Sequence, residues 1–122
     1  MVGSDSPLSW VVDSGASDHI ACNKGLFREF RKIRAGEKKL YVGNGQLVDV
    51  LGMGTCEVDF GSGHILALTN VLYAPEIVHN LMSIRKLTEC GNKVHFEGTN
   101  VIVKCNNGFN ISGFINGNLC LK

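Results

Sequence analysis

The sequence has no long apolar run, no marked excess of charge and no pair of cysteines at metal-binding spacing. No segment approaches the roughly 18 consecutive apolar residues that a membrane-spanning helix needs. Twelve lysines and arginines against eleven aspartates and glutamates give a net charge of +1, which does not indicate a nucleic-acid partner. With 44% hydrophobic residues in 122 positions, the chain is predicted to form one soluble globular domain.

The cysteines are odd in number and widely spaced, and no Cys-x-x-Cys motif occurs. The five are Cys22, Cys56, Cys90, Cys105 and Cys120. This pattern argues against a disulfide framework and a structural zinc site, and it favours a reducing compartment. His19 lies near Cys22 in the sequence, but no second ligand pair at a familiar spacing follows. We therefore expect a cytoplasmic protein with no bound metal and no cofactor.

Short apolar segments separated by glycine predict a mostly β fold. Trp10-Val11-Val12 forms one such segment and ends at Asp13, and Cys56, Val58 and Phe60 alternate with acidic residues as in a half-buried strand. Leu40–Val42 and Leu47-Val48 flank Gly43-Asn44-Gly45, which predicts a hairpin with a tight Asn-Gly turn. Further strands are predicted at Ile65–Leu68, Val71–Tyr73, Val94–Phe96 and Val101–Cys105.

One segment, near residues 80–90, has helical periodicity. Leu81, Ile84 and Leu87 would share one face of a helix. Asn80 is placed to cap the start of this helix, and Gly91 is placed to end it in a left-handed conformation.

The sequence Asp13-Ser14-Gly15-Ala16 directly follows the first apolar segment. A carboxylate is thereby expected where a buried strand ends and the backbone turns sharply. Gly15 would allow a second backbone to come close, and the Ser14 hydroxyl could brace the turn by hydrogen bonding. The same residues also fit an Asx or Ser/Thr turn in which Asp13 only caps the bend. The motif alone does not decide between these interpretations.

Asp13 is the only aspartate of the chain in an Asp-Ser/Thr-Gly motif. Aspartic-protease chemistry needs two carboxylates that share one proton and one water molecule. A single copy of this chain cannot supply that pair, whereas a two-fold homodimer can place one Asp13 from each subunit at the axis. The hypothesis of such chemistry therefore requires a second, identical subunit.

Two separated segments resemble signatures of the protease of copia-type LTR retrotransposons, within the retropepsin-like aspartic protease family. The segment Trp10–His19 resembles the active-site signature, including its trailing histidine. Asn70–Pro75, followed by Asn80–Ile84, resembles the second signature, and Gly91–Phe96 resembles the strand that follows the helix. The resemblance covers Trp10 to Phe96 in the correct order.

This resemblance implies a retropepsin-like closed β-barrel monomer with a flap hairpin and one short helix, paired in a two-fold homodimer. Its activity would be that of an endopeptidase that cleaves an extended segment of a retrotransposon Gag-Pol polyprotein, in the cytoplasm, and within virus-like particles if the element is active. The implied catalytic residues are Asp13, Ser14 and Gly15. The implied substrate-binding residues are Ala16, Ser17, Asp18, Gly43, Asn44, Gly45, Gln46, Ile77 and Val78.

The resemblance also divides the chain into three parts. Residues 1–9 would form a flexible leader, residues 10–97 the retropepsin-like protease domain, and residues 98–122 strands that complete the barrel or the dimer interface. One departure from the family concerns the helix start. Retroviral relatives carry Gly-Arg-Asn or Gly-Arg-Asp there, whereas this chain has Val78-His79-Asn80, and Ser17 replaces the acidic partner of that arginine. The usual Arg-acid pair is therefore not available to a dimer.

Two alternatives belong to other functional classes. The first is a catalytically silent retropepsin-like dimer that serves as a binding or assembly module. The second is a small β-barrel that binds nucleic acid through its cluster of basic residues. That cluster comprises Arg28, Arg31, Lys32, Arg34, Lys38 and Lys39. Few aromatic residues for base stacking lie near it, which argues against the second alternative.

Overall fold

The computed structural model describes residues 10–41, 45–114 and 119–121, and this part of the chain is mostly β with one short α-helix. The elements are β1 (Trp10–Asp13), β2 (Ile20–Ala21), a 3-10 helix (Lys24–Leu26), β3 (Phe27–Lys32), β4 (Lys39–Tyr41), β5 (Leu47–Asp49), β6 (Gly52–Asp59), β7 (Ile65–Tyr73), β8 (Asn80–Ser83), α1 (Ile84–Glu89), β9 (Lys93–Glu97), β10 (Asn100–Lys104), β11 (Asn110–Phe114) and β12 (Leu119–Leu121). The predicted mostly β class is confirmed. No helix in these residues is long and apolar enough to cross a membrane.

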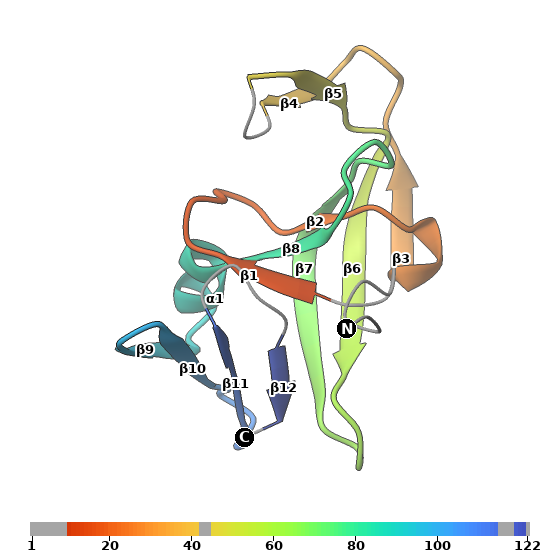
Figure 1. Ribbon diagram of the computed structural model, residues 1–122. Coiled ribbons are helices and arrows are strands. Elements are labelled where there is room, and N and C mark those ends of the chain that lie inside the picture. The colour runs from red at the N-terminus through yellow and green to blue at the C-terminus, as the bar shows by residue number, and fades with distance from the viewer. Residues whose placement is uncertain (1–9, 42–44, 115–118, 122) are drawn as a thin grey trace.

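The strands form three sheets (Figure 1). The largest has six strands in the order β1-β8-β2-β7-β6-β3, and a second has four in the order β12-β11-β10-β9. Strands β4 and β5 form a separate hairpin that projects beyond one end of the large sheet, at the top of Figure 1. Within the large sheet β1 runs parallel to β8 and β2 runs parallel to β7, whereas the other pairs are antiparallel.

The expected closed barrel is not found among the described strands. Strands β1 and β3 lie at opposite edges of the six-stranded sheet and do not pair with each other, so the hydrogen-bonded ladder does not close. Four of the six β3 residues carry exposed charged side chains. Exposed charge is typical of an edge strand that has no further partner. After β3 the chain leaves this sheet and enters the β4–β5 hairpin instead of closing the barrel.

Strands β3, β6 and β7 are irregular at one common level of the large sheet. The register shifts between Phe27 and Glu29 on β3 and between Gly54 and Cys56 on β6. Asn70 on β7 has a φ of +54°, in the left-handed region that asparagine tolerates better than most residues. The backbones of β3 and β6 come so close here that a Cβ atom at Gly54 would collide with the carbonyl oxygen of Glu29.

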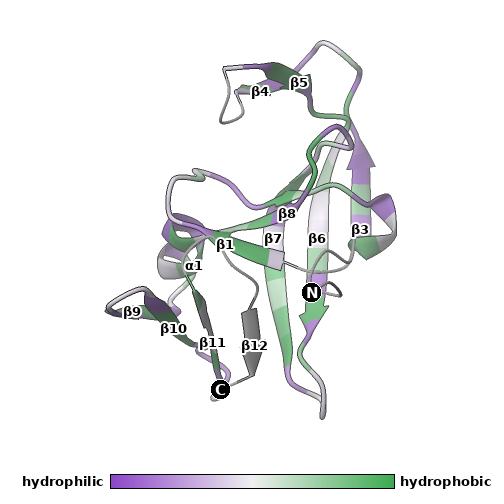
Figure 2. Ribbon diagram, viewed as in Figure 1, coloured by the Kyte–Doolittle hydropathy of each residue, from purple (hydrophilic) through white to green (hydrophobic). Residues whose placement is uncertain are grey.

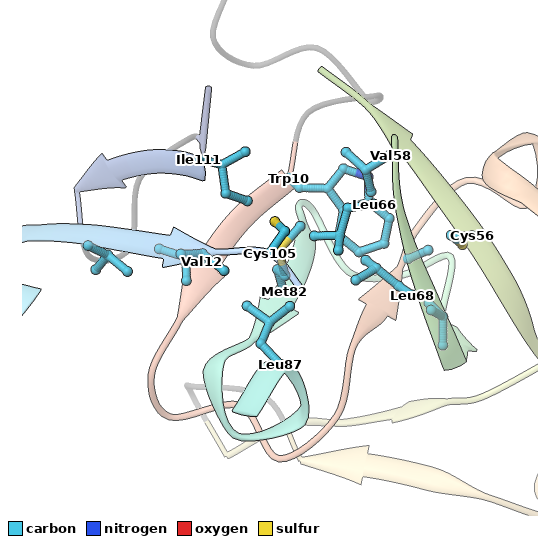
Figure 3. Close-up of a cluster of buried hydrophobic side chains, with 14 residues drawn as sticks. Trp10, Val12, Cys56, Val58, Leu66, Leu68, Met82, Leu87, Cys105 and Ile111 are labelled. Carbon is cyan, nitrogen blue, oxygen red and sulfur yellow. The ribbon is translucent and has the colours of Figure 1, made fainter. Parts of the chain in front are cut away.

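One hydrophobic core joins the large sheet, α1 and the C-terminal sheet (Figure 3). Its buried members are Trp10, Val12, Ala21, Cys56, Val58, Leu66, Leu68, Val71, Met82, Leu87, Val101, Val103, Cys105 and Ile111. Figure 2 shows apolar residues along β1 and β10 and hydrophilic residues at the end of β3. The described part of residues 98–122 therefore packs on the same core as β1 and does not form a separate unit.

The helix is shorter than predicted, and a different residue caps it. Asn80 and Leu81 belong to β8, and α1 begins at Ile84. The N-cap is Ser83, whose Oγ accepts a hydrogen bond from the backbone N–H of Lys86. Asn80 is instead buried as the first residue of β8, where tertiary contacts occupy its side chain. Two predictions for this segment are confirmed: Leu87 is buried, and Gly91 follows the helix with a φ of +92°.

The predicted hairpin is confirmed, but its register differs from that of a tight Asn-Gly turn. A two-residue turn at Asn44-Gly45 would place Leu47 opposite residue 42, whereas Leu47 pairs with Tyr41. Gly45 has a φ of +82°, as a turn glycine can. The proposed tip residues Gly43 and Asn44 lie outside the described residues.

The close approach of β3 and β6 makes Gly54 a sensitive position. We expect Gly54→Ala to lower the free energy of unfolding by about 3 kcal/mol or more, since the added methyl group must displace the backbone of β3. Gly63→Ala is the matched control: Gly63 has a φ of +79° and open space around it, so only left-handed strain of about 1 kcal/mol is expected. Denaturant unfolding of both variants measures the difference. Equal decreases in the free energy of unfolding would show that β3 can move away from Gly54 at no energetic cost.

Candidate active site

Asp13 is the last residue of β1, and its position depends on β8. The two strands run parallel, with Asp13 in register with Ser83. The chain then passes through residues 14–19 and returns as β2, which pairs with the opposite side of β8. The segment 14–19 therefore crosses the end of β8, at the point where α1 begins (Figure 1).

Two hydrogen bonds define the turn after Asp13. The backbone N–H of Gly15 donates to Oδ1 of Asp13 at 2.8 Å, and the N–H of Ala16 donates to the backbone carbonyl oxygen of Asp13 at 3.4 Å. The first bond is that of an Asx turn, the structural alternative that the sequence left open. It also orients the half-buried carboxylate of Asp13. The local geometry thus suits both capping of the bend and presentation of a carboxylate.

A pocket of about 590 Å³ lies beside this turn. It is lined by Asp13, Gly15, Ala16, Ser17, Ile20, Leu40, Tyr41, Ile77, Val78, His79 and Leu81. The lining combines the turn after β1, the β4–β5 hairpin and the loop before β8, which are far apart in the sequence. Tyr41 and Val78 are 78% and 80% exposed. The arrangement offers one carboxylate among mostly apolar walls.

The structure brings together some of the site residues predicted from the sequence and separates others. Asp13, Gly15, Ala16, Ser17, Ile77 and Val78 all line the pocket. Ser14 is exposed and does not line it, and Gly45 and Gln46 lie on the exposed part of the hairpin. Asp18 turns toward α1, where its Oδ1 lies 3.9 Å from Nζ of Lys86.

Five lining residues were missed by the sequence analysis. They are Ile20, Leu40, Tyr41, His79 and Leu81. Each lies within a few residues of a predicted position, and Leu40 and Tyr41 belong to the predicted hairpin itself. The prediction concentrated on the glycines of the hairpin tip, whereas the pocket is lined by the strand that leads to it. The apolar character of Leu40 and Tyr41 was the available signal.

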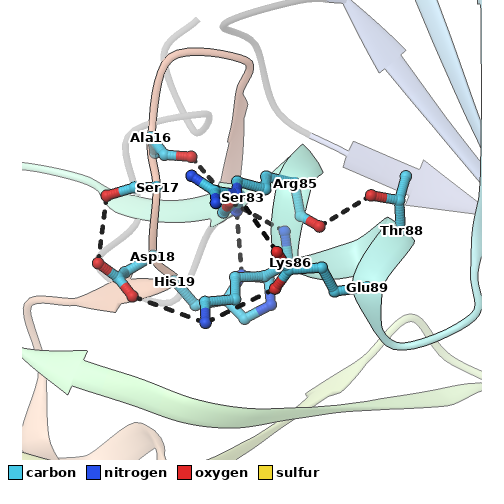
Figure 4. A network of polar contacts seen from close by, with 9 residues as sticks. All are labelled: Ala16, Ser17, Asp18, His19, Ser83, Arg85, Lys86, Thr88 and Glu89. Carbon is cyan, nitrogen blue, oxygen red and sulfur yellow. Dashed lines mark hydrogen bonds and ion pairs between the residues drawn. The ribbon is translucent and has the colours of Figure 1, made fainter.

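A network of polar contacts joins the loop 14–19 to the end of β8 and the start of α1 (Figure 4). The backbone N–H of Ser83 donates to Nδ1 of His19 at 3.0 Å, and the Ser83 hydroxyl donates to the carbonyl oxygen of Ala16 at 2.8 Å. The Ser17 hydroxyl donates to Asp18 at 3.2 Å. His19 and Ser83 are 2% and 0% exposed, so the bond between them is shielded from water, whereas the bond from Ser17 to Asp18 is exposed.

His19 is held in its neutral form. The pKa of His19 is lowered from 6.5 to about 4, mainly by burial and also by the positive charge of Lys86, while Asp18 acts in the opposite direction. A neutral imidazole that accepts at Nδ1 carries its proton on Nε2. The acceptor role toward Ser83 and the lowered pKa are therefore consistent with each other.

The cysteines show no arrangement for metal binding in the part of the chain that the structure describes. No group of three or more potential ligands gathers there. His19 bonds to Ser83, whereas the thiol of Cys22 donates to Oδ1 of Asn80 at 3.2 Å, so the two side chains serve different contacts. Cys22, Cys56, Cys90 and Cys105 are free thiols. Burial in the core raises the pKa of Cys56 to about 12.

The basic cluster lies on β3, the segment that follows it and the first residue of β4, and none of its members lines the pocket beside Asp13. Arg28 pairs with Glu57 at 2.7 Å and Lys39 pairs with Asp49 at 3.1 Å. The nearby rings of Phe27, Phe30 and Tyr73 pack edge-to-face on one another, with centroids 5.2–6.0 Å apart. These rings are used for internal packing, which does not favour the base-stacking platform of the nucleic-acid alternative.

His19 predicts a specific dependence of stability on pH. Because its pKa is about 4 in the folded protein and 6.5 in the unfolded chain, the unfolded chain binds more protons between these values. The neutral His19 ring contributes about 3 kcal/mol at most to the free energy of unfolding. This contribution is complete above pH 6.5 and is lost as the pH falls toward 4. In His19→Asn the side chain can still accept a hydrogen bond but does not titrate. Denaturant unfolding between pH 6.5 and about 4 should therefore show a steeper fall of the free energy of unfolding in the wild type than in His19→Asn. Parallel pH dependences of the two proteins would contradict the prediction.

Comparisons with known proteins give one family and no structural match. A family model described as "Pol polyprotein, beta-barrel domain" matches residues 10–92, which is more than half of the chain. No solved structure matches the chain. The matched segment runs from β1 through α1 and includes every residue that lines the pocket beside Asp13. The chain belongs to the Pol polyprotein beta-barrel domain family.

Proposed function

We propose that this chain is an aspartic endopeptidase of the retropepsin type, similar to copia-type proteases, which acts as a two-fold homodimer with one Asp13 from each subunit. Membership of a Pol polyprotein family is consistent with an origin in a retroelement. The proposed substrate is an extended segment of a Gag-Pol polyprotein, and the proposed location is the cytoplasm, within virus-like particles.

The observation that carries this proposal is the pocket beside Asp13. A carboxylate at the end of a buried strand lies at the edge of a cavity of about 590 Å³ with mostly apolar walls. Pockets of this kind, with few polar groups in an apolar lining, are typical of binding and catalytic sites. A turn that only capped the bend would not require such a cavity next to it.

The chemistry needs two carboxylates. When they lie side by side, repulsion between like charges keeps one ionised while the other holds a proton. The ionised Asp13 would take a proton from a water molecule, and the oxygen of that water would attack the peptide carbonyl carbon. The protonated Asp13 of the other subunit would give its proton to the carbonyl oxygen. Collapse of this intermediate breaks the C–N bond: the first Asp13 gives the proton that it took from water to the leaving amine, and the other Asp13 takes back its proton from the former carbonyl oxygen.

A second subunit supplies what one copy lacks. Asp13 is the only carboxylate among the described residues that line the pocket, and Asp18 faces Lys86 of α1 instead. A homodimer would bring a second Asp13 to the site without any further sequence requirement. The activity should therefore depend on protein concentration.

The pocket walls indicate what the substrate presents. Leu40, Ile77 and Leu81 offer apolar surface, and the exposed Tyr41 and Val78 extend it. A bulky apolar side chain of the peptide would bury this surface, with a gain of about 25 cal/mol for each Å² removed from water. The β4–β5 hairpin contributes Leu40 and Tyr41, so a movement of the hairpin would change access to the pocket.

Asp13→Asn should reduce peptide cleavage by about 10²- to 10⁴-fold, since it removes the acid-base group and keeps the size of the side chain. The measurement is cleavage of the flanking polyprotein by purified protein. Equal mixing with wild type should lower the wild-type activity to about half, because subunit exchange produces inactive mixed dimers. Dilution of the wild type should also lower its activity per molecule.

Asp59→Asn is the control for this experiment. Asp59 also ends a strand, and its Oδ1 accepts the N–H of the residue two positions later, Gly61, at 2.8 Å. It repeats the turn of Asp13 but does not line the pocket. This variant should cleave normally. A wild-type dimer without activity would instead support the silent binding module, and full activity in a proven monomer would rule out the paired mechanism.

A second experiment tests the hairpin. Gly45 and Gly36 have φ values of +82° and +86° and open space around them, so replacement by alanine should strain both by a similar amount, about 1 kcal/mol. Only Gly45 lies in the β4–β5 hairpin beside the pocket. Gly45→Ala should therefore lower kcat/KM by a factor on the order of 10, as misplaced positioning groups do, whereas Gly36→Ala should not. Equal kinetics in the two variants would remove the hairpin from the mechanism.

A further inference from the structure

The loop 14–19 connects β1 to β2, and side chains at the end of β8 and the start of α1 contact it along the way. It leaves β1 on one side of β8 and enters β2 on the other side. At the end of β8, Ser83 contacts the loop twice, through its backbone N–H and through its hydroxyl. We call Ala16, His19 and Ser83 the Ser83 clasp.

Each bond of the Ser83 clasp satisfies a group that has little access to water. Ser83 is completely buried, and a buried N–H without an acceptor is strongly unfavourable. Nδ1 of His19 provides that acceptor at 3.0 Å. The Ser83 hydroxyl donates a hydrogen bond to the carbonyl oxygen of Ala16 at 2.8 Å and accepts one from the backbone N–H of Lys86 at 3.2 Å. Ser83 therefore links the loop to α1 as well as to β8.

The Ser83 clasp bears directly on the turn that carries Asp13. Ala16, which the clasp binds, also donates its N–H to the carbonyl oxygen of Asp13. The carbonyl oxygen of His19 accepts the N–H of Leu72 at 2.9 Å, so the far end of the loop is fixed to β7. A loss of the His19 contact would leave the loop between Asp13 and β2 without one of its attachments to β8.

We propose that His19 is a positioning residue of the site: its neutral imidazole holds the loop 14–19, and with it Asp13, against β8, and protonation of the imidazole releases the loop. The inference rests on the proposed protease function for its effect on cleavage, although the clasp itself does not. A protonated ring would carry hydrogen on both nitrogens, so Nδ1–H would face the N–H of Ser83 and the bond could not form.

Burial, together with the charge of Lys86, keeps the ring of His19 neutral until the pH is well below 6.5. Lys86 of α1 opposes a second positive charge, while Asp18 of the same loop favours one. Lys86 is itself 3.9 Å from Asp18 and 3.8 Å from Glu89. Burial acts in the same direction as Lys86, and together they lower the pKa of His19 to about 4. The loop is thereby secured at neutral pH and released in acid.

Two substitutions separate the acceptor from the titration. In His19→Asn, the side-chain oxygen can reach the place of Nδ1 and accept from Ser83, but it does not gain a proton in this range. In His19→Leu, no acceptor remains. The first readout is the set of amide proton–nitrogen spectra of the free protein, recorded from pH 6.5 down through about 4. The amides of Ser83, Ala16 and Ser17 should shift with the midpoint of the His19 ring in the wild type. They should not show this transition in His19→Asn.

The second readout is cleavage. At neutral pH His19→Leu should lower kcat by about 10- to 100-fold with a smaller change in KM, because Asp13 is misplaced while the pocket walls remain. His19→Asn should restore kcat and should move the acid limb of the pH profile to lower pH. If His19→Leu does not fold, the comparison of wild type with His19→Asn still decides the matter.

The outcomes separate this inference from the proposed function. If the His19 ring titrates while the amides of Ala16 and Ser17 stay unchanged, the clasp does not hold the loop and the inference fails. An acid limb that is the same in wild type and His19→Asn would also overturn it. A wild-type dimer that cleaves no peptide would contradict the proposed function, and the spectra would then still test the clasp.

Discussion

Strand β8 has a partner on each side, and the site depends on both pairings. Its parallel pairing with β1 brings Asp13 beside Ser83, and its antiparallel pairing with β2 fixes the return of the chain after the turn. Because β8 continues directly into α1, the start of the helix contacts the loop 14–19 that follows Asp13. A short strand of four residues thus determines the position of the carboxylate, the cap of the helix and one wall of the pocket.

The C-terminal sheet contributes buried side chains to the same hydrophobic core as β1. Val101, Val103 and Ile111 are fully buried in the same core cluster as Trp10 and Val12 of β1. The match to the family ends at residue 92, so these three residues lie beyond the matched segment. Removal of large buried side chains typically costs 2–5 kcal/mol each. The strand that ends in Asp13 therefore depends for its stability on residues outside the part that identifies the family.

The local patterns that predicted β1, the hairpin and the buried face of α1 were sufficient because nearby residues determine those features. The assignment of Asn80 as a helix cap was wrong for a tertiary reason: its side chain accepts the N–H of Cys22 at 2.9 Å, a contact across 58 positions. Asparagine and serine are both good caps, so the sequence could not choose between Asn80 and Ser83. Among the predicted residues that meet in the pocket, Asp13 and Gly15 were indicated by the motif after the first apolar segment, whereas Ala16, Ser17, Ile77 and Val78 came from the family resemblance. Leu40 and Tyr41 were missed because their role depends on where the hairpin lies.

The long separation between β1 and its partners has a consequence for biosynthesis. Trp10–Asp13 can pair with Asn80–Ser83 only after the later segment has left the ribosome. The core is complete only after Ile111 has been made. Contacts between distant segments form slowly because the intervening chain must first be ordered. During translation the strand that ends in Asp13 therefore has no β8 to pair with until residues 80–83 have been made. A nascent chain that lacks residues 77–81 cannot form the pocket beside Asp13, so the order of synthesis itself delays formation of the pocket.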